Sequence, residues 1–470
     1  MENAAASWVH YAEPHLDRSK HTLIFCGSGN NGGDGYAIAR IMTDKGYQCS
    51  VVAVSDPKTE DCRQNAEIWK HYGKTLSWES AKAIFTSPPD CIIDSILGTG
   101  AERAIEGRLA EIVQWINKAP AKVLSVDMPT GVNASTGDIL NYAVHSDITI
   151  TFQLEKVGHH LFPGKSYCGK TICAKISIKE NIPGDQREFR LVDTDMVREF
   201  LPVRVAEGYK NLFGHLLVWA GSPGTLGAAY LAAKTGLISG AGLVTAALPK
   251  GEPSQFVSQV PECLTHLQEN ITLPWLNKFS AVVVGCGLGR QKRKWRKIVP
   301  LLSRLKVPVV VDADAFHGVE QGGQWSEEKF VLTPHPGEFA ALTGFKKPEN
   351  NAEKIDQALQ FVANNNAVLV LKGAPTIIVQ KNSPVYINST GNEGMATAGS
   401  GDVLAGLIGG LLAQGLPPMK AALLGTWLHG KSGDRAREKL GSESLIASSL
   451  IHSLSYAFQS LRPHPALHHP

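Results

Sequence analysis

The stretch Gly391–Gly415, GNEGMATAGSGDVLAGLIGGLLAQG, organises the second half of the chain. It opens with small, turn-forming residues and ends in an apolar run whose leucines recur on one face of a helix. A glycine-rich turn that opens a helix presents free backbone N–H groups and the positive end of the helix dipole. The stretch therefore predicts an anion-binding helix N-terminus.

Asp402 stands at the mouth of this predicted helix, where its charge would compete with a bound phosphate. The carboxylate is useful there if a hydroxyl group attacks a phosphoryl group and Asp402 accepts the hydroxyl proton. The alternative is that Ser400 or Asp402 only caps the helix, because both residue types are preferred N-caps.

Composition indicates a globular protein of two or three domains. The chain has 470 residues, 43% hydrophobic and 19% charged, and the formal net charge of +3 is too small to indicate nucleic-acid binding. The basic run Arg290–Lys297 is local and is interpreted as a solvated face. Eight scattered cysteines, with no CxxC pair or zinc spacing, indicate thiols of a cytoplasmic protein. The start lacks a signal-peptide pattern, and glycine or proline interrupts the long uncharged runs, so no membrane span is expected.

The first half begins with a predicted buried strand, His21–Cys26, followed by the turn GSGNNGGDG and a helix over Tyr36–Lys45. Gly27, Gly29 and Gly32 satisfy the dinucleotide pattern GxGxxG, which is weak on its own. The asparagines and aspartate inside the turn are unusual for a dinucleotide loop, which needs only close backbone approach.

Two further predicted strands of this half end in acids, at Asp94 and Asp127. The carboxyl ends of parallel strands share one edge of a sheet, where ligands bind. Asn31, Asp34, Asp94, Asp127 and Thr130 are therefore expected to converge on one cleft. Each of them singly has the alternative of being a helix cap.

The polar segment Lys179–Arg187 is the predicted boundary between domains at 1–183 and 187–470. Beyond it, predicted strands alternate with helices and end in glycine-rich or charged turns, which indicates a mostly parallel sheet. Lys372 at such an end could meet phosphate as a point charge, or could be an ordinary surface lysine. His335, between two prolines, could contact substrate or serve only the turn. The tail RPHPALHHP is expected to be disordered.

The first half resembles the epimerase domain of the NAD(P)H-hydrate repair enzymes, on the motifs NNGGDG, DSILGTG and VDMPTG. The resemblance implies a Rossmann-like α/β/α fold and a potassium ion held by Asn31, Asp94 and Thr130, all hard oxygen donors. The family usually has serine at the position of Thr130. Residues implied to contact the hydrated cofactor are Asn30, Asn31, Gly32, Gly33, Asp34, Gly98, Thr99, Gly100, Ala101, Glu102, Arg103, Ala104 and Asp127.

Epimerisation of the hydrate can proceed by loss and return of the C6 hydroxyl through an iminium ion, which needs an acid/base group near that oxygen. Asp127 is our candidate, with Lys156 as a weaker partner. Comparison with the family implies that the N-terminal helical segment is shortened here. One hypothesis is therefore that the first half acts only as a binding module.

The second half contains no Walker A sequence, and a phosphoryl-transfer site ending in AGSGD resembles the ribokinase-like α/β/α fold. The motifs GCGLG, VDADAF, TPHPGEFAALTG, KGAPT and GNEGMATAGSGDVLAG resemble the ADP- or ATP-dependent NAD(P)H-hydrate dehydratases. The family usually has proline where this chain has Cys286. By this resemblance the nucleotide is bound by Lys372, Gly373, Ala374, Pro375, Thr376 and Gly401, and the hydrate faces Ala228, Gly287, His335 and Asp402.

The resemblance predicts a bifunctional repair enzyme. Asp402 would deprotonate the C6 hydroxyl, which is phosphorylated and then eliminated as inorganic phosphate. Magnesium is expected because transferring phosphates need charge neutralisation, with Glu338 as a guess for its environment. A homotetramer is also implied. The alternatives are a ribokinase-like kinase of a vitamin precursor, and a nucleotide sensor without catalytic activity.

Overall fold

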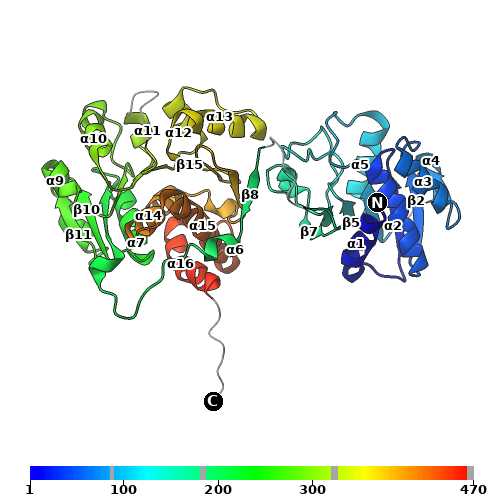
Figure 1. Ribbon diagram of the computed structural model, residues 1–470, viewed down its shortest axis with the longest axis horizontal. Helices are drawn as coiled ribbons and strands as arrows, with labels where there is room; N and C mark the ends of the chain where they lie inside the picture. The colour runs from blue at the N-terminus through cyan, green and yellow to red at the C-terminus, as the bar shows by residue number, and fades with distance from the viewer. Residues whose placement is uncertain (85–88, 180–186, 319–326, 463–470) are drawn as a thin grey trace, which may run out of the picture. The chain divides into compact units, whose positions relative to one another are not determined.

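The computed structural model describes residues 1–84, 89–179, 187–318 and 327–462, and the chain divides into two compact units, Met1–Gln186 and Arg187–Pro470 (Figure 1). Residues 180–186 of the predicted boundary and residues 463–470 of the predicted disordered tail lie outside the described ranges. No helix among the described residues combines the length and the apolar character needed to cross a membrane.

The first unit is built on a parallel seven-stranded sheet of order β3-β2-β1-β4-β5-β6-β7. The strands are β1 (His21–Cys26), β2 (Gln48–Ala53), β3 (Thr75–Ser77), β4 (Cys91–Ser95), β5 (Lys122–Val126), β6 (Ile148–Phe152) and β7 (Lys170–Ala174). The helices are α1 (Glu2–Ala12), α2 (Asn30–Asp44), α3 (Glu60–Trp69), α4 (Trp78–Ile84) and α5 (Gly107–Lys118). The predicted parallel α/β fold is confirmed.

The prediction of a glycine turn before a helix at Tyr36 is wrong, because helix α2 already begins at Asn30. Its glycines serve close packing: a Cβ on Gly32 would overlap the carbonyl oxygen of Gly27, and one on Gly35 would lie 2.6 Å from Ser95 Oγ. Asn31 and Asp34 therefore project from the first turns of a helix, beside the carboxyl ends of β1 and β4.

The second unit contains a ten-stranded sheet of order β11-β10-β9-β12-β13-β14-β15-β16-β17-β8. Its pairs are parallel except β15–β16 and β16–β17. The strands are β8 (Phe189–Val192), β9 (His215–Trp219), β10 (Leu243–Leu248), β11 (Leu264–Leu267), β12 (Ala281–Val284), β13 (Val309–Val311), β14 (Phe330–Leu332), β15 (Val368–Leu371), β16 (Ile377–Val379) and β17 (Val385–Asn388).

The helices of this unit are α6 (Thr194–Arg198), α7 (Leu226–Ile238), α8 (Pro253–Val257), α9 (Leu273–Leu276), α10 (Lys292–Arg304), α11 (Ala315–Gly318), α12 (Pro336–Thr343), α13 (Asn351–Asn364), α14 (Ser400–Ala413), α15 (Pro418–Leu440) and α16 (Ala447–Leu461). Helix α14 is buried along nearly its whole length and packs against α7, α15 and the central strands (Figure 1). A Cβ on Gly406 would overlap the carbonyl oxygen of Ala232, so glycine permits the close approach of α14 to α7. The helix predicted inside Gly391–Gly415 is thus the core helix of the unit.

Candidate active sites

In the first unit, Asp94 is a fully buried hydrogen-bond acceptor at the end of β4. Thr130 donates to it twice, from Oγ1 at 2.6 Å and from its backbone N–H at 2.8 Å, and Ser125 Oγ donates at 2.9 Å. Burial raises the pKa of this carboxyl group, and the hydrogen bonds oppose that rise. The structure thus brings the predicted residues Asp94 and Thr130 into contact.

Asn31 lies nearby, since Ser95 Oγ donates a 2.5 Å hydrogen bond to its backbone carbonyl. Its side chain packs against Gly98, where a Cβ would lie 3.2 Å from Asn31 Cβ. The side-chain nitrogen of Asn31 is buried and has no hydrogen-bond partner among the described residues. The carboxamide nitrogen is therefore available to a ligand atom that accepts a hydrogen bond.

Asp127 has the left-handed backbone conformation, with a φ of 66°, directly after β5. Its carboxylate accepts hydrogen bonds from Thr151 Oγ1 at 2.8 Å and from the Phe152 N–H at 3.2 Å, and it forms an ion pair with Lys156. His159 Nε2 donates to the Asp127 carbonyl at 3.0 Å. Burial, and then the charge of Lys156, lower the pKa of His159 to about 4, so this imidazole is neutral near pH 7. The predicted partnership of Asp127 and Lys156 is a direct contact.

Asp34 is a third acidic group of this site, near the start of α2. Burial raises its pKa to about 7; the positive charge of the chain's N-terminus opposes this rise, and the negative charge of Asp127 adds to it. The remaining predicted residues Thr99–Ala104 form a largely exposed loop. Sequence reasoning did not single out Ser125 or His159; for His159, its place shortly after Lys156 was the available signal.

In the second unit, the N-terminus of α14 is capped by Gly399, which has a φ of 87°. No side-chain hydrogen bond caps this helix, so the alternative that Ser400 or Asp402 serves as its cap is excluded. Ser400 Oγ instead lies 3.3 Å from His429 Nε2, a contact to α15. Asp402 therefore lies in the first turn of α14 without capping the helix.

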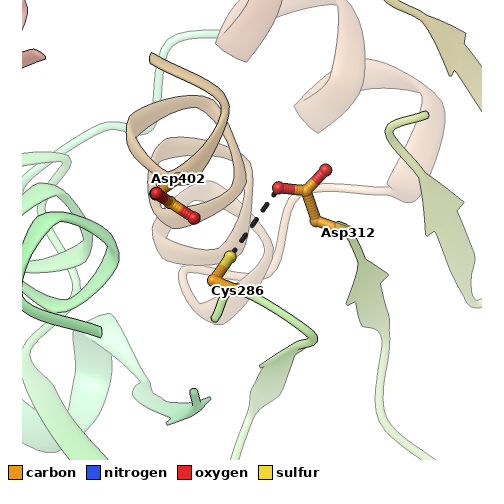
Figure 2. A group of neighbouring side chains, drawn as sticks. All are labelled: Cys286, Asp312 and Asp402. Atoms are coloured by element: carbon orange, nitrogen blue, oxygen red, sulfur yellow. Dashed lines mark hydrogen bonds between the residues drawn. The ribbon is translucent and has the colours of Figure 1, made fainter. Parts of the chain in front are cut away.

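Asp402 faces Cys286 and Asp312, which follow strands β12 and β13, and one ligand atom from each of the three lies within 4.8 Å of the others (Figure 2). The Cys286 thiol donates to Asp312 Oδ2 at 3.7 Å. Burial first, and then the charge of Asp312, raise the pKa of Asp402 to about 7. A carboxyl group with this pKa can take up or release a proton near neutral pH.

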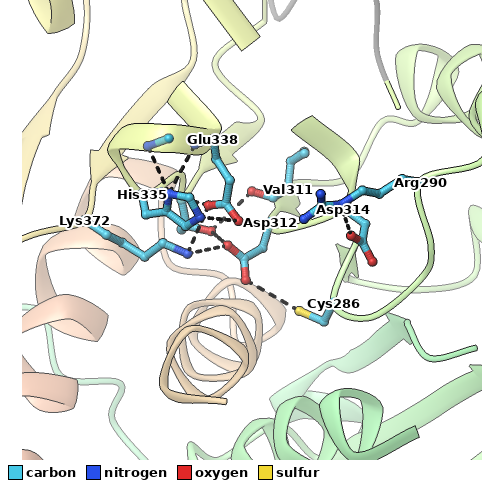
Figure 3. A network of polar contacts seen from close by, with 10 residues as sticks. Cys286, Arg290, Val311, Asp312, Asp314, His335, Glu338 and Lys372 are labelled. Carbon is cyan, nitrogen blue, oxygen red and sulfur yellow. Dashed lines mark hydrogen bonds and ion pairs between the residues drawn. The ribbon is translucent and has the colours of Figure 1, made fainter. Parts of the chain in front are cut away.

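Asp312 is the centre of a buried polar network at the carboxyl ends of β12–β15 (Figure 3). Its carboxylate accepts a hydrogen bond from Thr333 Oγ1 at 2.8 Å and forms an ion pair with Lys372 Nζ at 2.9 Å. Lys372 Nζ also lies 3.6 Å from Glu338. Sequence reasoning noted the VDADAF motif but did not assign Asp312 this position.

The network also contains His335, which is the N-cap of α12. Its Nδ1 accepts hydrogen bonds from the N–H groups of Gly337 at 3.0 Å and Glu338 at 3.1 Å. His335 therefore has a structural role, since its side chain caps helix α12. The His335 side chain is nevertheless 55% exposed, with its Nε2 lying 3.3 Å from Glu338 Oε1, and a substrate contact stays a prediction.

Two predicted pairs are neighbours in space. A Cβ on Gly401 would lie 3.2 Å from Lys372 Nζ, so these two predicted nucleotide-binding residues adjoin. A Cβ on Gly287 would lie 3.0 Å from Ala228 Cβ, at the start of α7. Gly373 and Ala374 are exposed, whereas Pro375 is buried beneath them.

These features define the class of protein. The second unit is a ribokinase-like fold with an acid and glycines at a helix N-terminus, and solved structures support this. The ADP/ATP-dependent NAD(P)H-hydrate dehydratase of Bacillus subtilis is 27% identical, with a TM-score of 0.54, over 59% of this chain and 100% of that one. A ribokinase-like superfamily protein of Enterococcus faecalis is 25% identical, with a TM-score of 0.53, over 61% of this chain and 100% of that one.

Sequence comparisons cover both units. A family model described as NAD(P)H-hydrate dehydratase matches residues 216–455, and one described as YjeF-related protein N-terminus matches residues 1–158. The bifunctional NAD(P)H-hydrate repair enzyme of Moorella thermoacetica is 38% identical over 98% of this chain and 92% of its own length. That of Escherichia coli is 30% identical over 93% and 84%. The chain belongs to the family of bifunctional NAD(P)H-hydrate repair enzymes.

Proposed function

We propose that the chain repairs hydrated NADH and NADPH in two steps. The first unit interconverts the R and S epimers, and the second dehydrates the S form using ADP or ATP. Family membership supports both activities. The observation that carries the second is Asp402, a partly buried carboxyl group with a pKa of about 7 at a helix N-terminus, close to Asp312 and beside Gly401.

In the second unit Asp402 accepts the proton of the C6 hydroxyl. The hydroxyl oxygen then forms a bond to the terminal phosphorus of the nucleotide, whose bridging P–O bond breaks. Loss of the phosphate from C6 and of a proton from the neighbouring ring carbon restores the double bond of the reduced nicotinamide. Phosphorylation is useful because hydroxide is a poor leaving group. We assign nucleotide contacts to Lys372–Thr376 and Gly401, and hydrate contacts to Ala228, Gly287 and His335.

Magnesium is part of this proposal, because the related B. subtilis dehydratase was co-crystallised with ATP and Mg²⁺. Among the described residues, one group of three potential ligands is close enough to hold an ion, namely Cys286, Asp312 and Asp402. It does not suit Mg²⁺, which prefers oxygen ligands, because one member is a thiol and an Asp312 oxygen already binds Lys372. We therefore assign no protein ligand to the magnesium ion, and Glu338, which faces Lys372, stays a guess.

In the first unit we propose Asp127 as the acid/base group that acts on the C6 oxygen, with Lys156 holding its carboxylate. The substrate contacts are assigned to Asn30–Asp34, Gly98–Ala104 and Asp127. Potassium is assigned to Asn31, Asp94 and Thr130. The donor set fits a hard cation, since it offers carboxylate, hydroxyl and carboxamide oxygens, and Asp94 and Thr130 already lie in contact.

We extend the proposal to a cytoplasmic homotetramer that acts on small molecules and not on nucleic acid. The support is the free state of all eight cysteines, the small net charge and the family resemblance.

The test is the near-ultraviolet absorbance of reduced nicotinamide, measured on a mixture of R and S NADH hydrate with ADP or ATP and magnesium. Full recovery, faster than spontaneous exchange of the epimers, establishes both activities. Recovery of the S fraction alone means that the first unit only binds. No recovery with either nucleotide contradicts the proposal and favours a kinase, which would release a stable phosphorylated product instead of inorganic phosphate.

A further inference from the structure

The positive charge of Lys372 is already balanced inside the protein. Its ammonium group lies 2.9 Å from Asp312 and 3.6 Å from Glu338, and both carboxylates are buried. A cation that faces two carboxylates offers little net charge to a phosphate. The loop 372–376 therefore needs another source of positive charge if it binds the phosphates of a nucleotide.

Lys354, on the first turn of α13, supplies an ammonium group to the same loop. Its Nζ donates a hydrogen bond to the carbonyl of Pro375 at 3.2 Å. A Cβ on Gly373 would lie 2.8 Å from this nitrogen, so the ammonium group fills the space beside the glycine. Helix α13 packs on β15 and β16, the strands that flank the loop, which fixes the position of the lysine.

No ion pair to a carboxylate is recorded for Lys354 within the part of the chain that the structure describes. The acids near it on α13 have other partners: Asp356 pairs with Arg187 at 2.9 Å, and Glu353 accepts a hydrogen bond from the Glu349 N–H at 2.8 Å. Burial alone lowers the pKa of Lys354 to about 8. An ammonium group buried without an acid is costly, and a bound anion would offset that cost.

We propose that Lys354 binds a phosphate group of the nucleotide at the loop 372–376. The inference rests on the proposed function in one respect, namely that ADP or ATP binds at this loop. Nucleotide binding then stabilises the charged form of Lys354, while Lys372 stays in its ion pair with Asp312. The opposing possibility is that Lys354 only supports the backbone of the loop through Pro375.

The experiment is calorimetric titration of the full chain with ADP, AMP and adenosine in the presence of Mg²⁺. Wild type is compared with Lys354→Met, Lys354→Arg and the control Lys347→Met, which removes the same charge from an exposed position a few residues away. Because a hydrogen bond to a charged group is worth about 1.5–3 kcal/mol, Lys354→Met should weaken ADP binding by about tenfold or more. Adenosine should bind Lys354→Met as it binds wild type, and Lys354→Arg should retain most of the ADP affinity.

Equal weakening of ADP, AMP and adenosine would mean a supporting role and overturn the proposal. Unchanged ADP affinity in folded Lys354→Met would overturn it as well. Failure of the proposed function looks different, because wild type itself would then bind neither ADP nor ATP.

Discussion

At the scale of single residues, the site of the second unit depends on the carboxyl group of Asp402, whose pKa the protein raises. Asp402→Asn removes the proposed base and keeps the shape of the side chain. General base catalysis contributes about 10²–10⁴-fold to a reaction rate, so the rate of dehydration of the S hydrate should fall by about 10²-fold or more. The rate of NADH formation at saturating ADP or ATP measures it. A loss below tenfold would mean that another group accepts the proton.

The same substitution should stabilise the protein in a pH-dependent way. The pKa of Asp402 is raised from the ordinary value of 3.8 to about 7, so between these pH values the folded state holds a proton that the unfolded state has lost. Stability from this group therefore falls as pH rises from about 4 to 7, and the cost above pH 7 is a few kcal/mol in order of magnitude. Calorimetric melting should show Asp402→Asn raising the Tm more at pH 8 than at pH 4.5. An equal rise at both pH values would contradict the shifted pKa.

In the first site, Asp127→Asn removes the charge that Lys156 faces. Interconversion of R and S hydrates should be abolished, whereas dehydration of pure S hydrate should continue at the wild-type rate. Chromatography of the two epimers over time measures the exchange. Asp44→Asn, on the exposed end of α2, is the matched control. Retained exchange in Asp127→Asn would move the role to Asp34, whose pKa of about 7 suits a proton carrier.

At the scale of elements, the packing of α14 on α7 depends on glycine. Gly406→Ala places a methyl group against the carbonyl oxygen of Ala232, so the second unit should lose about 1–3 kcal/mol of stability, as overpacked cores do. Gly227→Ala is the control, because nothing lies within 4 Å of its Cβ position in α7. Alanine there should be neutral or stabilising. Denaturant unfolding of both variants tests the contrast, and an unaffected Gly406→Ala would mean that the two helices can move apart without cost.

The elements also show where local patterns mislead. A run of glycine and asparagine before Tyr36 has the composition of a turn, yet α2 begins at Asn30. Tertiary packing overrides the low helix propensity of glycine here, because only glycine fits between Gly27 and β4. A strand was easier to predict: β1 has the predicted bounds, His21–Cys26, since a short buried apolar run that ends at a turn has few alternatives.

At the scale of the whole molecule, the two compact units imply that the second activity is separable. The solved B. subtilis dehydratase matches 59% of this chain over its entire length, which supports the same conclusion. The fragment 187–470 should therefore dehydrate S hydrate, and should leave the R fraction to slow spontaneous exchange. Adding the fragment 1–186 should restore rapid use of the R form. A soluble fragment 187–470 that binds ADP without dehydrating S hydrate would show that the units depend on each other.

The sequence by itself determined the alternation of buried strands and helices, the parallel sheets, and the placing of Asp94, Asp127 and Lys372 at or near strand ends. These properties follow from local apolar patterns and from the geometry of a parallel sheet. Only the tertiary structure decided that Asp312 balances the charge of Lys372, that Lys354 approaches the loop at Gly373, and that Asp402 ionises near pH 7. Burial and ion pairing depend on residues that are distant in the chain, so no local pattern contains them.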